Sequence, residues 1–358
     1  MRLSAILCVA LALATPARAG RAPGPDRRSQ APASDQPQQP QQPAPGSEAL
    51  PAALTAARAL VDAGRPADAI ARLAALDRAD PRVQHLTGVA LYHADRRREA
   101  ITALEAVPAR LPEGSIERRE AEQVLGLSLF LEGRFADAIP WLERTRAALP
   151  ENLELNFTLG QAYIRTGNAG AARAALAKTF GVAADSAAAH VVAAQLMIRL
   201  QMEAMAEEEL TLALARDPRA VRANFLLGQI ALFRGQLDAA ADRSTRELAL
   251  NPSDAMAAYQ LGDALLRQNR GDEAIAALQR SLWLNPFYSG PYILLGRAYM
   301  KKAQPATAEG MLRRAIEYDP NNRAAHYLLA QLLQQQGREE EAKQEFAIAE
   351  RLSTRGQE

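Results

Sequence analysis

Residues 289–320 read SGPYILLGRAYMKKAQPATAEGMLRRAIEYDP and predict two helices joined by a short turn. Apolar residues recur at helical spacing in each half, as Leu294 and Ala298 do in the first and Leu312 does in the second. Pro320 lacks a backbone N–H and disfavours helix in the residue before it, so it ends the second helix. The stretch therefore reads as helix, turn, helix and stop.

This stretch is one copy of a tandem repeat. Seven alanines share a step of 34 residues: Ala138, Ala172, Ala206, Ala240, Ala274, Ala308 and Ala342. Glycines precede most of them by 12 residues: Gly126, Gly160, Gly228, Gly262 and Gly296. A fixed period of this length indicates an array of helical units that bury their apolar faces only by stacking. We expect the small residues to let paired helices approach closely.

The unit from Ser289 resembles a tetratricopeptide repeat. The matching signature positions are Tyr292, Leu295, Gly296, Tyr299, Ala308, Leu312, Ala315 and Pro320. Units starting near residues 50, 81, 119, 153, 187, 221, 255, 289 and 323 follow the same pattern, with residues 115–118 as an insert. The resemblance implies an all-α fold, a right-handed α-solenoid of about nine helix-turn-helix repeats over residues 50–352. Residues 353–358 would form a short tail.

Some units depart from the pattern. The repeat from Val221 carries Ser244 and Glu247 where apolar or small residues are usual. Its second helix is expected either to be looser than the others or to make a contact of its own.

The N-terminus reads as a secretory signal. Arg2 precedes an apolar run over residues 3–14, and Ala17 and Ala19 supply the small residues of a cleavage site after Ala19. A run of 12 residues is shorter than the about 20 that span a bilayer, although an uncleaved anchor is the alternative. We therefore expect residues 1–19 to be a signal peptide and the protein to be periplasmic or secreted.

The next segment, residues 20–49, is rich in proline and glutamine and predicts a disordered tether. Pro37, Pro40 and Pro43 would share one edge of a polyproline II helix, so a docking motif is the alternative to a plain spacer. Cys8, the single cysteine, lies in the predicted signal. Its removal would exclude disulfides and thiol catalysis.

The charge and the motifs of the sequence argue against catalysis and against nucleic-acid binding. The formal net charge is +1, with acids and bases interleaved, which is unfavourable for nucleic-acid binding. Ser128 lacks the second glycine of a nucleophile elbow. The histidines show no metal-binding spacing and are expected on the surface or in a groove: His85, His93, His190 and His326. We expect no enzyme, no cofactor and no metal site.

In the family that this chain resembles, the first helix of each unit lines a concave groove. The corresponding apolar row is Phe157, Val191, Phe225, Tyr259, Ile293 and Tyr327. The next row, mostly amides, is Gln161, Gln195, Gln229, Asp263, Arg297 and Gln331. A basic row follows: Arg165, Arg199 and Arg267, with Lys301 beside them. Glutamine amides both donate to and accept from a peptide backbone, and the basic row favours an acidic ligand. Alternatively, much of the apolar row packs between neighbouring helices.

These observations predict a non-catalytic interaction scaffold of the bacterial envelope. It would bind a peptide segment or a helical partner protein in the concave groove and assist assembly of an envelope complex. One alternative is a structural solenoid that assembles into a homo-oligomer, and another is a hydrolase with its site in the groove.

Overall fold

The structure is a computed structural model that describes residues 49–355. This range holds eighteen α-helices and one 3₁₀-helix (Pro108–Arg110), and it contains no strand, so the all-α prediction is confirmed. The predicted signal peptide and nearly all of the predicted tether lie outside the described residues, as do residues 356–358.

The helices form nine consecutive pairs. These are α1 (Ala49–Asp62) and α2 (Pro66–Leu73), α3 (Pro81–His93) and α4 (Arg97–Leu104), α5 (Ile116–Leu131) and α6 (Phe135–Ala148), α7 (Leu153–Arg165) and α8 (Ala169–Phe180), α9 (Ala187–Arg199) and α10 (Glu203–Arg216), α11 (Ala223–Phe233) and α12 (Leu237–Leu250), α13 (Ala255–Arg267) and α14 (Gly271–Leu284), α15 (Ser289–Lys301) and α16 (Pro305–Tyr318), and α17 (Arg323–Gln335) and α18 (Glu339–Arg355).

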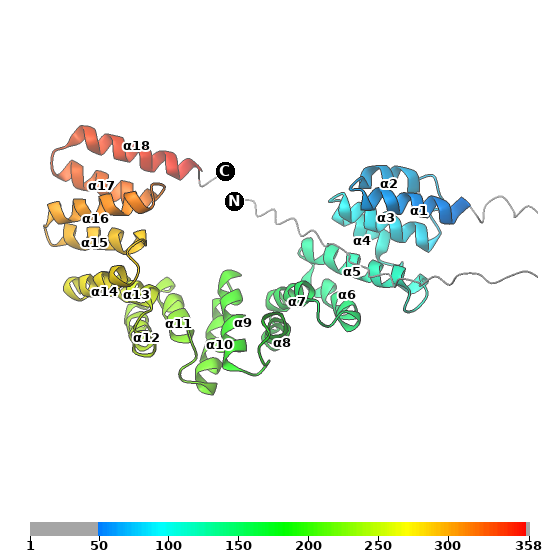
Figure 1. Cartoon of the computed structure of the whole chain (residues 1–358), viewed down its shortest axis with the longest axis horizontal. Helices are drawn as coiled ribbons and strands as arrows, with labels where there is room; N and C mark the ends of the chain where they lie inside the picture. The colour runs from blue at the N-terminus through cyan, green and yellow to red at the C-terminus, as the bar shows by residue number, and fades with distance from the viewer. Residues whose placement is uncertain (1–48, 356–358) are drawn as a thin grey trace, which may run out of the picture.

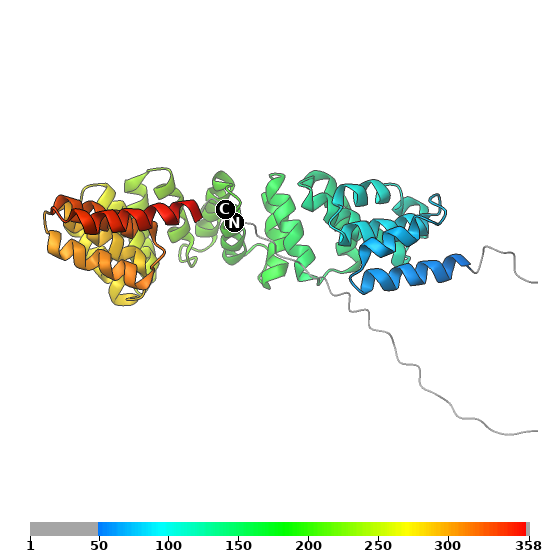
Figure 2. The same ribbon diagram turned by 90° about the horizontal axis from the view of Figure 1, so that it is seen from above.

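The pairs follow one another along an open arc. Figure 1 shows α1–α4 at one end of the arc and α17 and α18 at the other, facing each other across the opening, and Figure 2 shows the same arc from above. The two helices of a pair pack together, and the second packs on the first helix of the next pair. This arrangement confirms the predicted α-solenoid.

Two boundaries differ from those expected. Residues 116–118 do not form an insert but add a turn to the start of α5. The cause is Ser115, whose Oγ accepts a hydrogen bond of 3.1 Å from the backbone N–H of Arg118 and caps the helix. At the other end, α18 runs to Arg355, past the expected limit at residue 352.

Close helix packing explains the repeated glycines. A Cβ atom added at Gly262 would lie 2.5 Å from Cγ of Leu278, which is well inside van der Waals contact. Gly296 is in the same relation to Leu312 on the partner helix of its own pair. The expectation that small residues permit close approach is confirmed at these positions.

The turns between paired helices share one left-handed residue at the 34-residue step. Glycine fills it at four of these positions: Gly133, Gly167, Gly235 and Gly337. Non-glycine residues adopt the same positive φ at Gln201, Asn269 and Ala303. The fold thus imposes the left-handed turn even where the side chain disfavours it.

The unusual repeat from Val221 contains a buried polar cluster. Ser244 stands where the other repeats place a large apolar residue against the glycine of the first helix, and Gln260 of α13 fills the space beside Gly228. The Ser244 Oγ donates a hydrogen bond of 2.8 Å to Oε1 of Gln260, whose Nε2 donates to the carbonyl oxygen of Phe225 at 3.3 Å. The alternative in which this helix makes a contact of its own is confirmed.

Three of the four histidines are buried, which corrects the expectation of surface or groove positions. His190 is 1% exposed, and its Nδ1 lies 2.7 Å from Oε2 of Glu209, a carboxylate that Arg173 also contacts. His326 and Glu345, also 19 residues apart, pair at 2.6 Å in the last repeat. His190 and His326 each have a carboxylate partner on the second helix of their own pair, whereas the partner of His85 is Glu120 on α5, the first helix of the next pair. Spacing within one helix does not show these relations.

Candidate binding surface

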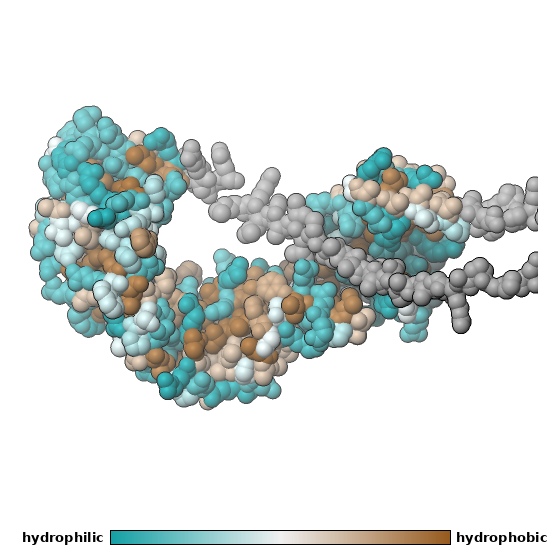
Figure 3. Space-filling model, viewed as in Figure 1, coloured by the Kyte–Doolittle hydropathy of each residue, from teal (hydrophilic) through white to brown (hydrophobic). Residues whose placement is uncertain are grey.

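The first helices of the pairs face the inside of the arc. Figure 1 shows α7, α9 and α11 toward the inner side and α8 and α12 toward the outer side. The first helices of most neighbouring pairs also contact one another, as α11, α13, α15 and α17 do in succession, so their side chains form rows across these repeats. In Figure 3 apolar surface gathers over the middle of the arc, around α9–α11.

The predicted apolar row divides into two groups. Val191, Phe225 and Ile293 are at most 9% exposed and pack in the core, as the alternative of packing between neighbouring helices expects. Packing between neighbouring first helices accounts for them. Phe157 and Tyr259 are half-buried, and Tyr327 is 44% exposed.

The second row is more accessible. Exposed or half-buried side chains occupy all six positions: Gln161, Gln195, Gln229, Asp263, Arg297 and Gln331. Burial raises the pKa of the Asp263 carboxyl, and the nearby Arg267 and Arg297 act in the opposite direction. This row therefore presents mixed hydrogen-bonding groups with cations beside the one carboxylate.

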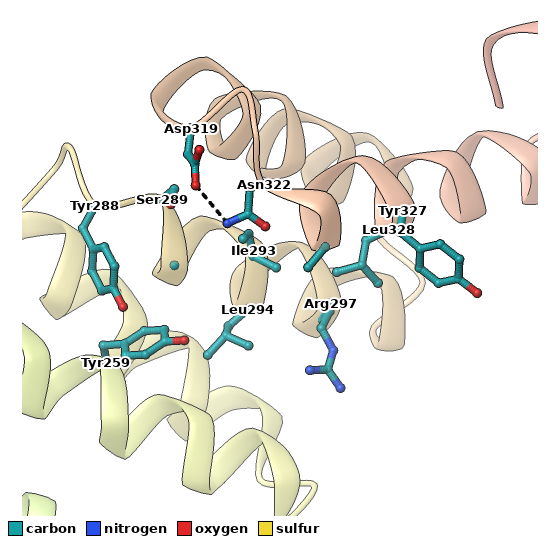
Figure 4. A pocket seen from close by; sticks show the side chains of 12 residues that line it. Tyr259, Tyr288, Ser289, Ile293, Leu294, Arg297, Asp319, Asn322, Tyr327 and Leu328 are labelled. Atoms are coloured by element: carbon teal, nitrogen blue, oxygen red, sulfur yellow. Dashed lines mark hydrogen bonds between the residues drawn. The ribbon is translucent and has the colours of Figure 1, made fainter. Parts of the chain in front are cut away.

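Part of the first two rows meets in a hollow near the C-terminal end of the arc (Figure 4). Its volume is about 710 Å³, and α13, α15, α17 and the loops before α15 and α17 line it. Tyr259, Ile293, Arg297 and Tyr327 of the predicted site lie along it. These four are brought together, whereas the other predicted residues are spread along the arc.

The hollow includes residues that the sequence analysis missed. Tyr288, in the loop before α15, packs edge-on against Tyr259 with ring centroids 5.1 Å apart, and burial raises the pKa of Tyr259. Across the hollow from the two tyrosines, Asn322 donates a hydrogen bond of 3.2 Å to Asp319 of its own loop. Loop residues such as these follow no helical period, so the row analysis could not find them.

The basic row is exposed at Arg165, Arg199 and Arg267. Phe233 stands at the same 34-residue step between Arg199 and Arg267, and it is 80% exposed. The 34-residue step reveals Phe233, whereas a search for charged residues alone passes over it.

Two further features concern membranes and metals. No helix of the described range 49–355 has the length and apolarity that crossing a membrane requires. Within the same residues, no group of three or more His, Cys, Asp or Glu side chains is arranged to hold a metal ion.

Comparisons with known proteins agree with this architecture. Two family models, both described as tetratricopeptide repeat, match the chain, one at residues 129–196 and 299–351 and the other at residues 54–115, 204–247 and 232–289. No curated protein matches the sequence.

Several solved structures are similar in fold. A crystal structure of MamA is 23% identical, with a TM-score of 0.41, over 46% of this chain and 95% of that chain. Pseudomonas aeruginosa pilF is 21% identical, with a TM-score of 0.46, over 56% and 91%. Cut9–Hcn1, an APC/C hetero-tetramer, is 18% identical, with a TM-score of 0.43, over 78% and 55%.

Proposed function

The chain belongs to the tetratricopeptide repeat family, whose members are generally protein–protein interaction scaffolds, and from this premise we propose that it is a non-catalytic adaptor of the bacterial envelope. It holds a peptide segment or a helix of a partner protein on the concave face and assists assembly of an envelope complex. The pattern of residues 1–19 supports export.

The hollow between α13, α15 and α17 is the observation that carries the proposal. Tyr259 and Tyr288 provide aromatic surface at one end, Arg297 provides a charged donor, and Asn322 provides an amide. Such a mixture fits a partner whose side chains are apolar and whose backbone needs hydrogen bonds. Tyr327 also lines the hollow and adds a third aromatic ring, which is exposed and packs edge-on against Phe346.

The experiment is a crosslinked pull-down from native envelope extract with the exported protein. The test variant is Arg297→Ala/Tyr327→Ala, because both side chains are exposed and their removal should leave helicity unchanged. Trp283→Ala is the matched control, since Trp283 is 83% exposed and does not line the hollow. We expect a partner that the wild type and the control capture and the test variant loses.

Other outcomes would contradict the proposal. A partner retained equally by all three proteins would place binding outside the hollow. Recovery of the protein alone would favour self-assembly over an adaptor role. An intact Met1 on cytoplasmic protein would contradict export.

A further inference from the structure

Five exposed side chains follow one another at the 34-residue step in five successive repeats: Arg165, Arg199, Phe233, Arg267 and Lys301. Each is the last residue of the first helix in its pair. We call this line the Phe233 edge. It borders the concave face, and it deepens the proposed function by specifying the chemistry of the bound segment.

The four cations of the Phe233 edge have no carboxylate within ion-pair distance in the described part of the chain. The neighbouring positions differ, because Arg234 pairs with Glu207 and Lys302 pairs with Asp272 across repeats. Within the Phe233 edge, Arg267 donates only to the carbonyl oxygen of Leu232, at 3.2 Å. The two cations at neighbouring positions are thus paired with carboxylates, whereas those of the Phe233 edge form no ion pair within the described residues. Arg267 lies near Asp263, and Lys301 donates a hydrogen bond of 3.0 Å to Oδ1 of Asn269.

Helix dipoles explain part of this pattern. Cations at the C-terminal end of a helix interact favourably with its last carbonyls. Phe233 has no such interaction, yet it occupies the centre of the line and exposes 80% of its surface. Exposed aromatic residues between cations are typical of anchors in protein interfaces.

We infer that the Phe233 edge binds an extended acidic segment of a partner protein, with an apolar side chain on Phe233 and carboxylates on Arg199 and Arg267. Contacting helices lie about 8–10 Å apart, and an extended segment in the polyproline II conformation advances about 9 Å over the three residues that bring a side chain back to the same edge. Each repeat therefore matches every third residue of the segment. The segment alternates acidic side chains with two neutral residues and carries its apolar residue at the middle of the line.

Synthetic peptides test this inference directly. The first peptide has Glu at every third position, with Leu replacing the central Glu and Ser elsewhere. A second peptide has Lys in place of Glu, and a third has the same composition as the first with its Glu residues grouped at one end. Binding to the full exported chain is measured by fluorescence anisotropy at low and high salt.

We expect the first peptide to bind best and to weaken as salt screens its charges. Phe233→Ala should weaken binding by about tenfold. Arg199→Gln/Arg267→Gln should weaken binding and reduce its salt dependence. Trp283→Ala and Arg219→Gln, which change an exposed aromatic and an exposed cation away from the Phe233 edge, should bind as the wild type does.

Equal binding of the Lys peptide, or binding that the Phe233 edge variants do not change, would overturn the inference. So would a self-association that Phe233→Ala abolishes, because the edge would then join two copies of the chain. If no peptide binds while the Arg297 and Tyr327 variant still loses a captured partner, the acidic-segment inference is wrong and the proposed function stands. If no peptide binds and the Arg297→Ala/Tyr327→Ala variant also keeps its partner, both the acidic-segment inference and the proposed function are wrong.

Discussion

The Oε2 atom of Glu247 accepts a hydrogen bond of 3.1 Å from the backbone N–H of Phe225, and its Oε1 accepts one of 3.2 Å from the N–H of Arg222. Glu247 is 1% exposed and lies on α12, whereas the two donors are at the start of α11. The first N–H groups of a helix have no partner within the helix, so a carboxylate from the neighbouring helix satisfies them. The buried carboxylate of Glu247 therefore stabilises the start of α11, where the preceding residue, Arg222, has a φ of 67°.

We predict that Glu247→Ala lowers the free energy of unfolding by about 2–3 kcal/mol, because it leaves one buried and one partly buried donor without acceptors. Glu247→Gln should cost less, since its amide oxygen keeps one acceptor. Urea unfolding measures the difference, and hydrogen exchange at the first amides of α11 locates it. Glu208→Ala, an exposed change on α10, is the control. Similar unfolding midpoints for Glu247→Ala and the control would contradict the role of this carboxylate.

Glu120 links the first three repeats and makes their stability sensitive to acid. Burial by itself would raise the pKa of its carboxyl, but contact with His85, whose Nε2 lies 2.8 Å from Oε2, and a hydrogen bond from Arg58 lower the pKa to about 2. An unfolded Glu has a pKa of about 4.3. Because the folded value is lower, the contribution is present above about pH 4 and is lost as the pH falls toward 2.

We therefore predict that Glu120→Gln reduces stability at neutral pH and flattens the decline of the melting temperature between about pH 5 and pH 2. The contribution at neutral pH is on the order of 3 kcal/mol. Glu113→Gln, at an exposed loop position, should keep the wild-type pH profile. If Glu120→Gln and the wild type decline in parallel, this carboxylate does not carry the acid sensitivity.

Ala303 is held in a conformation that suits glycine. Its φ is 54°, at the turn position where Gly337 has a φ of 77° one repeat later. Ala303→Gly should raise the free energy of unfolding by up to about 1 kcal/mol. The left-handed region costs an L-residue roughly 1–2 kcal/mol, and glycine avoids this cost. Part of the gain is offset because glycine loses more conformational entropy on folding than alanine does. Gly337→Ala should lower stability by a comparable amount. Thermal unfolding of both variants checks the opposite signs, and a loss of stability in Ala303→Gly would show that the turn is not strained.

The sequence was sufficient to predict features that depend on local chemistry. Helix periodicity, the proline stops and the glycine turns all involve residues within one helix pair, and the structure reproduces them. The missed features depend on neighbours in other elements. Val191 and Phe225 are buried because an adjacent first helix covers them, and His190 is buried because Glu209 on α10 accepts its hydrogen bond. Periodicity gives the face of a helix but not the residue that covers it.

The contact between Ser244 and Gln260 gives the sharpest test of how neighbouring repeats couple. The next repeat has Leu278 and Leu294 at the two equivalent positions, and both are buried. Ser244→Leu alone forces a leucine into space that the Gln260 amide occupies, so it should destabilise the protein by about 1–3 kcal/mol. Ser244→Leu/Gln260→Leu copies the apolar pair of the next repeat and should recover much of that loss.

A double-mutant cycle by urea unfolding, with Gln260→Leu as the second single variant, measures this coupling. We expect an interaction energy of about 1–3 kcal/mol between the two sites, which is typical of residues in direct contact. Additive effects within about 0.5 kcal/mol would show that the two side chains do not compete for the same space. Strong coupling would mean that the polar cluster replaces the apolar contact of the other repeats as a unit, because neither substitution is compatible with the fold unless the other accompanies it.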